Sequence, residues 1–318
     1  METIKMKNIS SLEKHFASDD FNALKEYSGA SALKGERFSY HAAYVCEDIR
    51  GDVKKTLYCR VCSPVSEYIT VSRIDQVPVR LPMYKIDGDD YYLSREPGLY
   101  PDLLVPVNEK SPLYAFKNEL MCLRIDVAIP EDAEAGSFPI ELSLVDGEGE
   151  AAAKTVFELE IIDAALPEQK IRVTQWFHAD CLASYYRVNV FSEEHWRIVG
   201  EFIKTAVKNG INMILTPVLT PALDTAVGGE RPTVQLVDVF KSGGAYSFGF
   251  EKLERWVNMC LSLGVKYFEI SHLFTQWGAE HAPKVMATVD GEYKKIFGWE
   301  TDAAGTTTAS FLQLSCPL

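Results

Sequence analysis

Short runs of alternating apolar and polar residues fill the first half of the chain, from residue 35 to residue 162. In the first run, one face carries Phe38, Tyr40, Ala42, Tyr44 and Cys46, which is the spacing of a strand with one buried side. Similar runs, separated by turn-forming Gly and Asp residues, follow at 57–62, 68–74, 91–93, 121–128, 140–145 and 155–162. Many short strands without a long helix between them predict an antiparallel β-sandwich over residues 35–166. Residues 1–34 are expected to form a helical or irregular lead-in.

Two helical stripes follow in the second half. Ser192 is a suitable N-cap, and the apolar stripe behind it spans 196–207 and ends at Asn209-Gly210. The second stripe spans 253–261 and ends at Gly264. Trp196 and Trp256 lie on these stripes, so we expect both to be ordinary packing residues.

Three short apolar runs alternate with these helices, at 171–177, 211–215 and 265–270. Alternating strands and helices predict a parallel sheet, with site loops after the strands. We therefore expect residues 167–318 to form the N-terminal part of a (β/α)8 TIM-type barrel. The barrel would be incomplete, because a whole one usually needs about 250 residues.

The composition excludes some classes of function. The 318 residues carry a net charge of −13, which argues against nucleic-acid binding, since that needs clustered Lys and Arg. Residues 1–8 lack the apolar core of a signal peptide, and no apolar run has membrane-spanning length. We expect a cytoplasmic protein without a membrane partner or a cofactor, and leave the oligomeric state open.

The cysteines fit that location. There are seven, an odd number, scattered mostly through apolar strand patterns, which favours reduced thiols. Cys59 and Cys62 form a C-x-x-C, but on a strand they would point to opposite faces. We expect both to be structural.

Polar and aromatic residues cluster after the first and third strands of the second half. His178 and Asp180 follow the first strand, whereas His272, Gln276 and Trp277 follow the third. Aromatic platforms beside carboxylates, amides and imidazoles suit a sugar. Structural hydrogen bonding remains an alternative for His178 and Asp180, and so does a metal pair with His272 as a further ligand.

Three further residues are candidates for substrate binding. Asp224 and Arg231 bracket a glycine pair in a long loop, and an ion pair that orders the loop is as plausible as sugar contact. Trp299 is a possible stacking platform. His195, in a helix first turn, and His281 are expected to be surface or loop residues.

Several segments resemble one family. They include Trp-Phe-His-Ala-Asp-Cys at 176–181, Ser-His-Leu-Phe-Thr-Gln-Trp-Gly-Ala at 271–279, and segments at 98–104, 129–136, 219–225, 228–237 and 297–299. They resemble glycoside hydrolase family 123 and the related domain of unknown function 4091 family, over nearly the whole chain. The resemblance implies a β-sandwich followed by a (β/α)8 barrel that hydrolyses β-linked N-acetylhexosaminides, notably of N-acetylgalactosamine. It also implies a substrate-assisted retaining mechanism that uses an adjacent Asp-Glu pair.

The sequence departs from the family at this pair. No Asp-Glu dipeptide occurs in it, so no catalytic residue is assigned. The tail Ser315-Cys-Pro-Leu equals a one-base shift of codons for Phe-Leu-Pro-Ala. We therefore expect an inactive copy that a frameshift truncated at its C-terminal end. A non-catalytic carbohydrate-binding protein and, less favoured, a metal-dependent barrel hydrolase are the alternatives.

Overall fold

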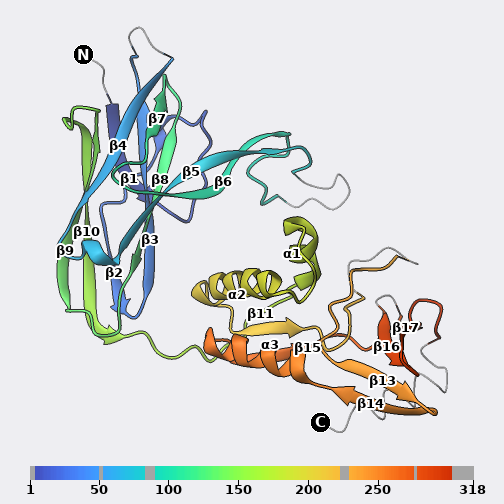
Figure 1. The fold of residues 1–318 in the computed structure, drawn as a ribbon. Helices are drawn as coiled ribbons and strands as arrows, with labels where there is room; N and C mark the ends of the chain where they lie inside the picture. The colour runs from blue at the N-terminus through green and yellow to red at the C-terminus, as the bar shows by residue number, and fades with distance from the viewer. Residues whose placement is uncertain (1–3, 50–52, 83–89, 223–228, 276–277, 303–318) are drawn as a thin grey trace. The chain divides into compact units, whose positions relative to one another are not determined.

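The computed structural model describes residues 4–49, 53–82, 90–222, 229–275 and 278–302 (Figure 1). The chain divides into two compact units, Met1–Glu168 and Gln169–Leu318.

Two five-stranded sheets build the first unit. In spatial order, the first sheet consists of β1 (Ile4–Ser10), β3 (Arg37–Cys46), β8 (Met121–Ala128), β5 (Ile69–Val79) and β6 (Gly98–Val107). The second consists of β2 (Gly29–Lys34), β10 (Ala151–Ala165), β9 (Gly136–Val145), β4 (Lys54–Cys62) and β7 (Leu113–Phe116). Neighbouring strands are antiparallel, except that β2 runs parallel to β10. Its described residues also form two short 3-10 helices, η1 (Phe21–Ala23) and η2 (Ser66–Tyr68).

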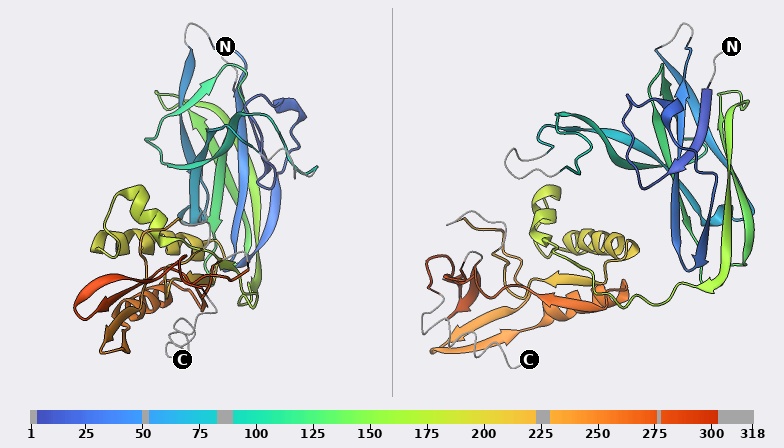
Figure 2. Two further views of the ribbon diagram at one scale, coloured as in Figure 1. Left: turned by 90° about the vertical axis from the view of Figure 1, so that its right-hand side faces the viewer. Right: turned by 180° about the vertical axis from the view of Figure 1, so that it is seen from behind.

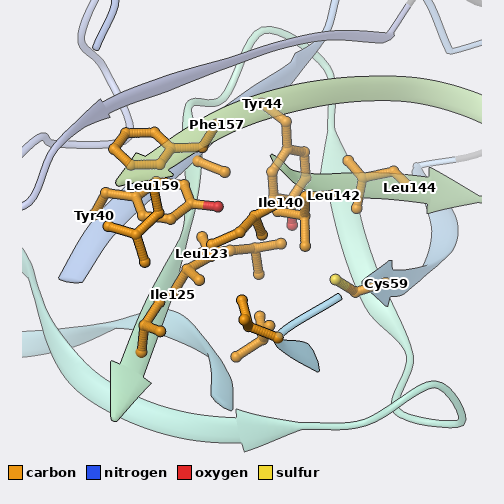
Figure 3. Packing of buried hydrophobic residues seen from close by; sticks show 14 of the residues in the cluster. Tyr40, Tyr44, Cys59, Leu123, Ile125, Ile140, Leu142, Leu144, Phe157 and Leu159 are labelled. Carbon is orange, nitrogen blue, oxygen red and sulfur yellow. The ribbon is translucent and has the colours of Figure 1, made fainter. Parts of the chain in front are cut away.

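The two sheets bury one core between them (Figures 2 and 3). Tyr40, Ala42, Tyr44 and Cys46 are all buried there, so the predicted inward face of β3 is confirmed. The ring of Tyr40 stacks on Phe157 with ring centroids 4.0 Å apart.

The C-x-x-C cysteines lie on opposite faces of β4, as predicted. Cys59 is buried in the core, and burial raises the pKa of its thiol to about 12. Cys62 is exposed. Because they point apart, they cannot act together.

Three details of the prediction are wrong. Residues 1–34 are not a lead-in, since they supply β1 and β2, one edge strand to each sheet. The run at 91–93 is not a strand, and Tyr91 and Leu93 are strongly exposed. β6 and β7 are additional strands, which the alternation at 98–107 and 113–116 was too weak to reveal.

A three-stranded parallel sheet begins the second unit. Its order is β11 (Thr174–Gln175), β12 (Met213–Thr216) and β15 (Tyr267–Ile270). The described part of this unit contains three helices, α1 (Ala179–Tyr186), α2 (Glu193–Lys208) and α3 (Glu251–Ser262). Among the helices that the structure describes, none is long and apolar enough to cross a membrane.

The predicted incomplete (β/α)8 barrel is wrong. Within 169–302, apart from the gaps given above, the other strands form a separate four-stranded sheet. Its order is β14 (Ala245–Gly249), β13 (Asp238–Ser242), β16 (Val285–Val289) and β17 (Glu292–Phe297).

Turn geometry explains the difference. Gly243 and Gly244 have φ angles of 55° and 86°, and Asp290 and Gly291 have φ angles of 50° and 91°. Positive φ at both positions of a two-residue turn closes a hairpin. The chain therefore folds back twice, at places where a barrel would need a helix.

The two predicted helices of the second half are confirmed. The Ser192 hydroxyl accepts a hydrogen bond from the backbone N–H of His195 at 3.3 Å and caps α2. Trp196 and Trp256 pack in one core. The prediction for His195 is wrong, because the ring is fully buried. Its Nδ1 accepts from the N–H of Phe191 at 3.0 Å, so its Nε2 donates to the carbonyl of Ala179 at 2.9 Å.

Candidate functional site

The three-stranded sheet has one face under helices and one face away from them. Ile214 of β12 and Phe268 of β15 are register partners that pack with Trp196 and Trp256 of the helices. The next pair, Leu215 and Glu269, points to the opposite face, because side chains alternate along a strand.

Glu269 is held on that opposite face by two donors. The hydroxyl of Thr174 donates to its carboxylate at 2.6 Å, and the indole N–H of Trp176 donates at 3.1 Å. Both donors come from the other edge of the sheet, beyond β12. The two hydrogen bonds fix the carboxylate and the indole with respect to each other.

Trp176 also contacts His272, which follows β15. Their rings meet edge to face, with centroids 5.4 Å apart. Trp176 stays 46% exposed, and His272 Nδ1 has no hydrogen-bond partner within the described part of the chain. An open aromatic face therefore lies beside a fixed carboxylate and an imidazole.

The sequence predicts His272 as a site residue, together with Gln276 and Trp277, but does not predict Trp176 or Glu269. Glu269 stands inside an apolar strand run and is therefore predicted to be part of the strand. Its position one residue after the core-facing Phe268 was the available signal. A carboxylate on an otherwise apolar strand commonly needs partners.

Asp180 and Arg231 are brought together as an ion pair. The guanidinium donates from Nε to Asp180 Oδ2 at 2.8 Å and from Nη2 to Oδ1 at 3.1 Å. Their side chains are 4% and 11% exposed. Arg231 also contacts Cys181 Sγ at 3.2 Å. The pair joins the first turn of α1 to a segment 51 residues later in the chain.

Trp299 lies at a small pocket. The pocket has a volume of about 20 Å³, enough for little more than a water molecule. Glu230 in its lining lies 2.5 Å from Lys295 and 3.2 Å from Lys284. The hydrogen bond from Lys295, followed by that from Lys284, lowers the pKa of Glu230. The Trp299 ring packs against His281, with centroids 5.4 Å apart.

Of the remaining candidates, the structure describes one. His178 is half-buried at the N-cap of α1. Asp224, Gln276 and Trp277 lie outside the described residues. Within the described ranges, no group of three or more His, Cys, Asp or Glu side chains is placed to hold a metal ion.

Comparison with known families bears on this second unit. Residues 176–313 match the family model described as glycoside hydrolase 123, catalytic domain. The match confirms the resemblance to that family, whereas the relation to the domain of unknown function 4091 family stays a prediction. Among curated proteins, no sequence matches the chain.

Comparison with solved structures bears on the whole fold. The chain resembles a family 123 glycoside hydrolase from Clostridium perfringens, with 13% identity and a TM-score of 0.72. The similarity covers 98% of this chain and 54% of that one, so the chain spans about half the length of that protein. A DUF4466 family protein from Parabacteroides merdae has 13% identity over 49% of this chain and 44% of that one. Its TM-score of 0.28 is too low to indicate a shared fold.

Proposed function

Since residues 176–313 match the catalytic domain of glycoside hydrolase family 123, we propose that the chain binds a β-N-acetylhexosaminide. The binding surface is the sheet face that carries Trp176, Glu269 and His272. The observation that supports this assignment is the half-exposed indole of Trp176, held in place by a hydrogen bond to a carboxylate.

The chemistry of this face suits a sugar ring. The C–H-rich face of a pyranose packs on an aromatic ring, and hydroxyl or amide groups bind carboxylates. Glu269 accepts two hydrogen bonds from the protein, and an ionised carboxylate has about four acceptor sites. It therefore keeps capacity for hydroxyl or N–H groups of a ligand.

A more specific proposal is the activity that the family resemblance implies, which is hydrolysis of an N-acetyl-β-galactosaminide by the substrate-assisted route. That route uses an adjacent Asp-Glu pair, which this 318-residue sequence does not contain. Glu269 has no Asp neighbour, since Phe268 and Ile270 flank it. We therefore expect the chain by itself to bind sugar without turning it over.

Calorimetry with methyl N-acetyl-β-D-galactosaminide tests the binding site. Trp176→Ala should weaken binding by roughly tenfold, because it removes the stacking surface and one partner of Glu269. His272→Ala should weaken it less. Phe240→Ala is the matched control, since Phe240 is an exposed aromatic on β13 of the other sheet. Equal affinity for all four proteins, with unchanged circular dichroism, would return Trp176 and His272 to a purely structural role.

A further inference from the structure

A separate cavity of about 210 Å³ lies in the first unit. It opens on the face of the β1-β3-β8-β5-β6 sheet that points away from the sandwich core. His41 of β3 and Arg124 of β8, register partners on this face, both line it. Their neighbours Tyr40 and Leu123 point the other way, into the core.

The segment from the end of β1 through η1 covers this face. Phe21 packs on Ala43 and Val45 of β3 in a small second core. Phe16 meets Tyr100 of β6 edge to face, with ring centroids 5.2 Å apart. The segment thus forms a wall over the sheet and leaves the cavity beneath it.

His41 is the first sign that the cavity takes a ligand. The residue is 7% exposed and lines the cavity, and no hydrogen bond to its ring is found among the described residues. Burial, followed by the positive charge of Arg124, lowers the pKa of His41 to about 4. The ring is therefore neutral near pH 7 and offers one donor and one acceptor.

Further unused polar capacity lies around the same space. Arg124 donates to Asp126 from Nε at 3.1 Å and to Ser39 from Nη2 at 2.9 Å. In the described structure its Nη1 makes no hydrogen bond. Gln76 Oε1 is buried at the cavity without a partner among the described residues.

An ion pair at the exposed edge adds both signs of charge. Lys14 lies 2.7 Å from Asp102, and their side chains are 56% and 65% exposed. The lining therefore offers cationic and imidazole donors together with amide and carboxylate acceptors. A simple anion would leave the acceptors unused, and a neutral polyol would give the remaining Arg124 donor only an uncharged hydrogen-bond partner.

We propose that this cavity binds a small hydroxylated carboxylate of monosaccharide size, of the hexuronic acid class. The carboxylate lies against Arg124 and His41, and the hydroxyl groups donate to Gln76 and Asp102. The volume agrees, because it falls between a cavity of about 150 Å³ that holds benzene and drug-sized pockets of roughly 300 Å³ or more. This site lies wholly within the first unit and does not depend on the sugar site proposed for the second.

Calorimetry with D-glucuronate on the full 318-residue chain tests the proposal. D-glucose, which lacks the carboxylate, and acetate, which lacks the hydroxyls, are the comparison ligands. We expect saturable binding of glucuronate, about tenfold or more tighter than of either comparison ligand, because charge-assisted and hydroxyl hydrogen bonds act together.

Variants test whether the measured heat of glucuronate binding comes from this cavity. His41→Gln and Gln76→Leu should each weaken glucuronate binding by about tenfold. Lys154→Gln is the control, since Lys154 is an exposed cation on β10 that pairs with Glu141. Trp176→Ala should leave glucuronate affinity unchanged, which separates this cavity from the site in the second unit. Gln76→Leu changes a half-buried residue, so it keeps the test decisive if His41→Gln fails to fold.

Three results would overturn the proposal. They are no saturable glucuronate binding, equal binding of glucose or acetate, and glucuronate binding that Gln76→Leu leaves unchanged in a folded protein.

Discussion

The indole N–H of Trp176 donates a hydrogen bond of 3.1 Å to the carboxylate of Glu269, 93 positions later in the sequence. The two residues belong to opposite edges of a three-stranded sheet, with β12 between them. The bond therefore spans the sheet and turns the exposed indole into a fixed surface. This fixed surface is what the proposed sugar site requires.

Replacing Glu269 with Leu should loosen this surface. Thr174 and Trp176 lose their shared acceptor, and the free energy of unfolding of the second unit should fall by about 1 kcal/mol, because the donors are partly exposed. Affinity for the N-acetyl-β-galactosaminide should fall several-fold. Urea titration followed by tryptophan fluorescence measures the first effect, since all five tryptophans lie in the second unit. Glu292→Gln, which breaks an exposed pair with Lys294, is the control, and equal loss in both variants would contradict the assignment.

Removing Asp180 should be more costly. Asp180→Ala leaves the guanidinium of Arg231 buried without its carboxylate, and breaking such a pair typically costs about 3–5 kcal/mol. The double variant Asp180→Ala/Arg231→Met should lose less than the sum of the two single variants, because it removes both charges of the pair together. Tryptophan fluorescence in urea reports both quantities. Strict additivity would mean that the two side chains are not coupled.

The chain by itself should not hydrolyse a chromogenic N-acetyl-β-galactosaminide. General acid–base help alone is worth about 10²–10⁴-fold in rate, and the Asp-Glu pair that supplies it is absent from these 318 residues. Release of the chromophore by pure protein at a steady rate, lost in Glu269→Gln, would contradict this and would make Glu269 a catalytic residue.

Acidification should destabilise the first unit through His41. Its pKa of about 4 in the folded state lies below the value of about 6.5 expected for the unfolded chain. The unfolded state therefore takes up the proton first. Stability is fully present above pH 6.5 and is lost as the pH falls toward 4, by on the order of 3 kcal/mol.

The His41→Gln variant isolates this effect. Far-ultraviolet circular dichroism in urea at pH 7 and pH 5 should show a smaller drop for the variant than for the parent. The charged and titratable groups that act on the ring or line the cavity with it are Arg124, Asp126, Cys122, Asp102, His15 and Lys14. Identical drops in both proteins would assign the acid sensitivity to these groups instead.

Local patterns predicted much of the first unit. Alternation identified the inward face of β3, because burial of one strand face leaves a period of two in the sequence. It did not reveal β1, where Lys5 and Lys7 alternate with Ile4 and Met6 in a run of seven residues. Such a run is too short to separate an edge strand from an irregular segment.

The second unit shows what patterns leave open. Ser192 marked the start of α2 because capping is local. The partner of Arg231 could not be predicted, since Asp180 lies 51 positions away. The dipeptides Gly243-Gly244 and Asp290-Gly291 are recognisable hairpin signals in the sequence. The alternation of strands and helices before these turns predicted a barrel, which the described residues do not form.

The first 34 residues have a consequence for how the protein behaves in solution. β1 and β2 are the outermost strands of the two sheets, one covering β3 and the other covering β10. Without them, β3 with 10 residues and β10 with 15 would become the edge strands in place of β1 with 7 and β2 with 6, and short edge strands protect a sheet better than long ones. Open edges recruit strands from other molecules. This short stretch thus protects the protein against self-association. Its removal should yield a protein that aggregates rather than a smaller β-sandwich.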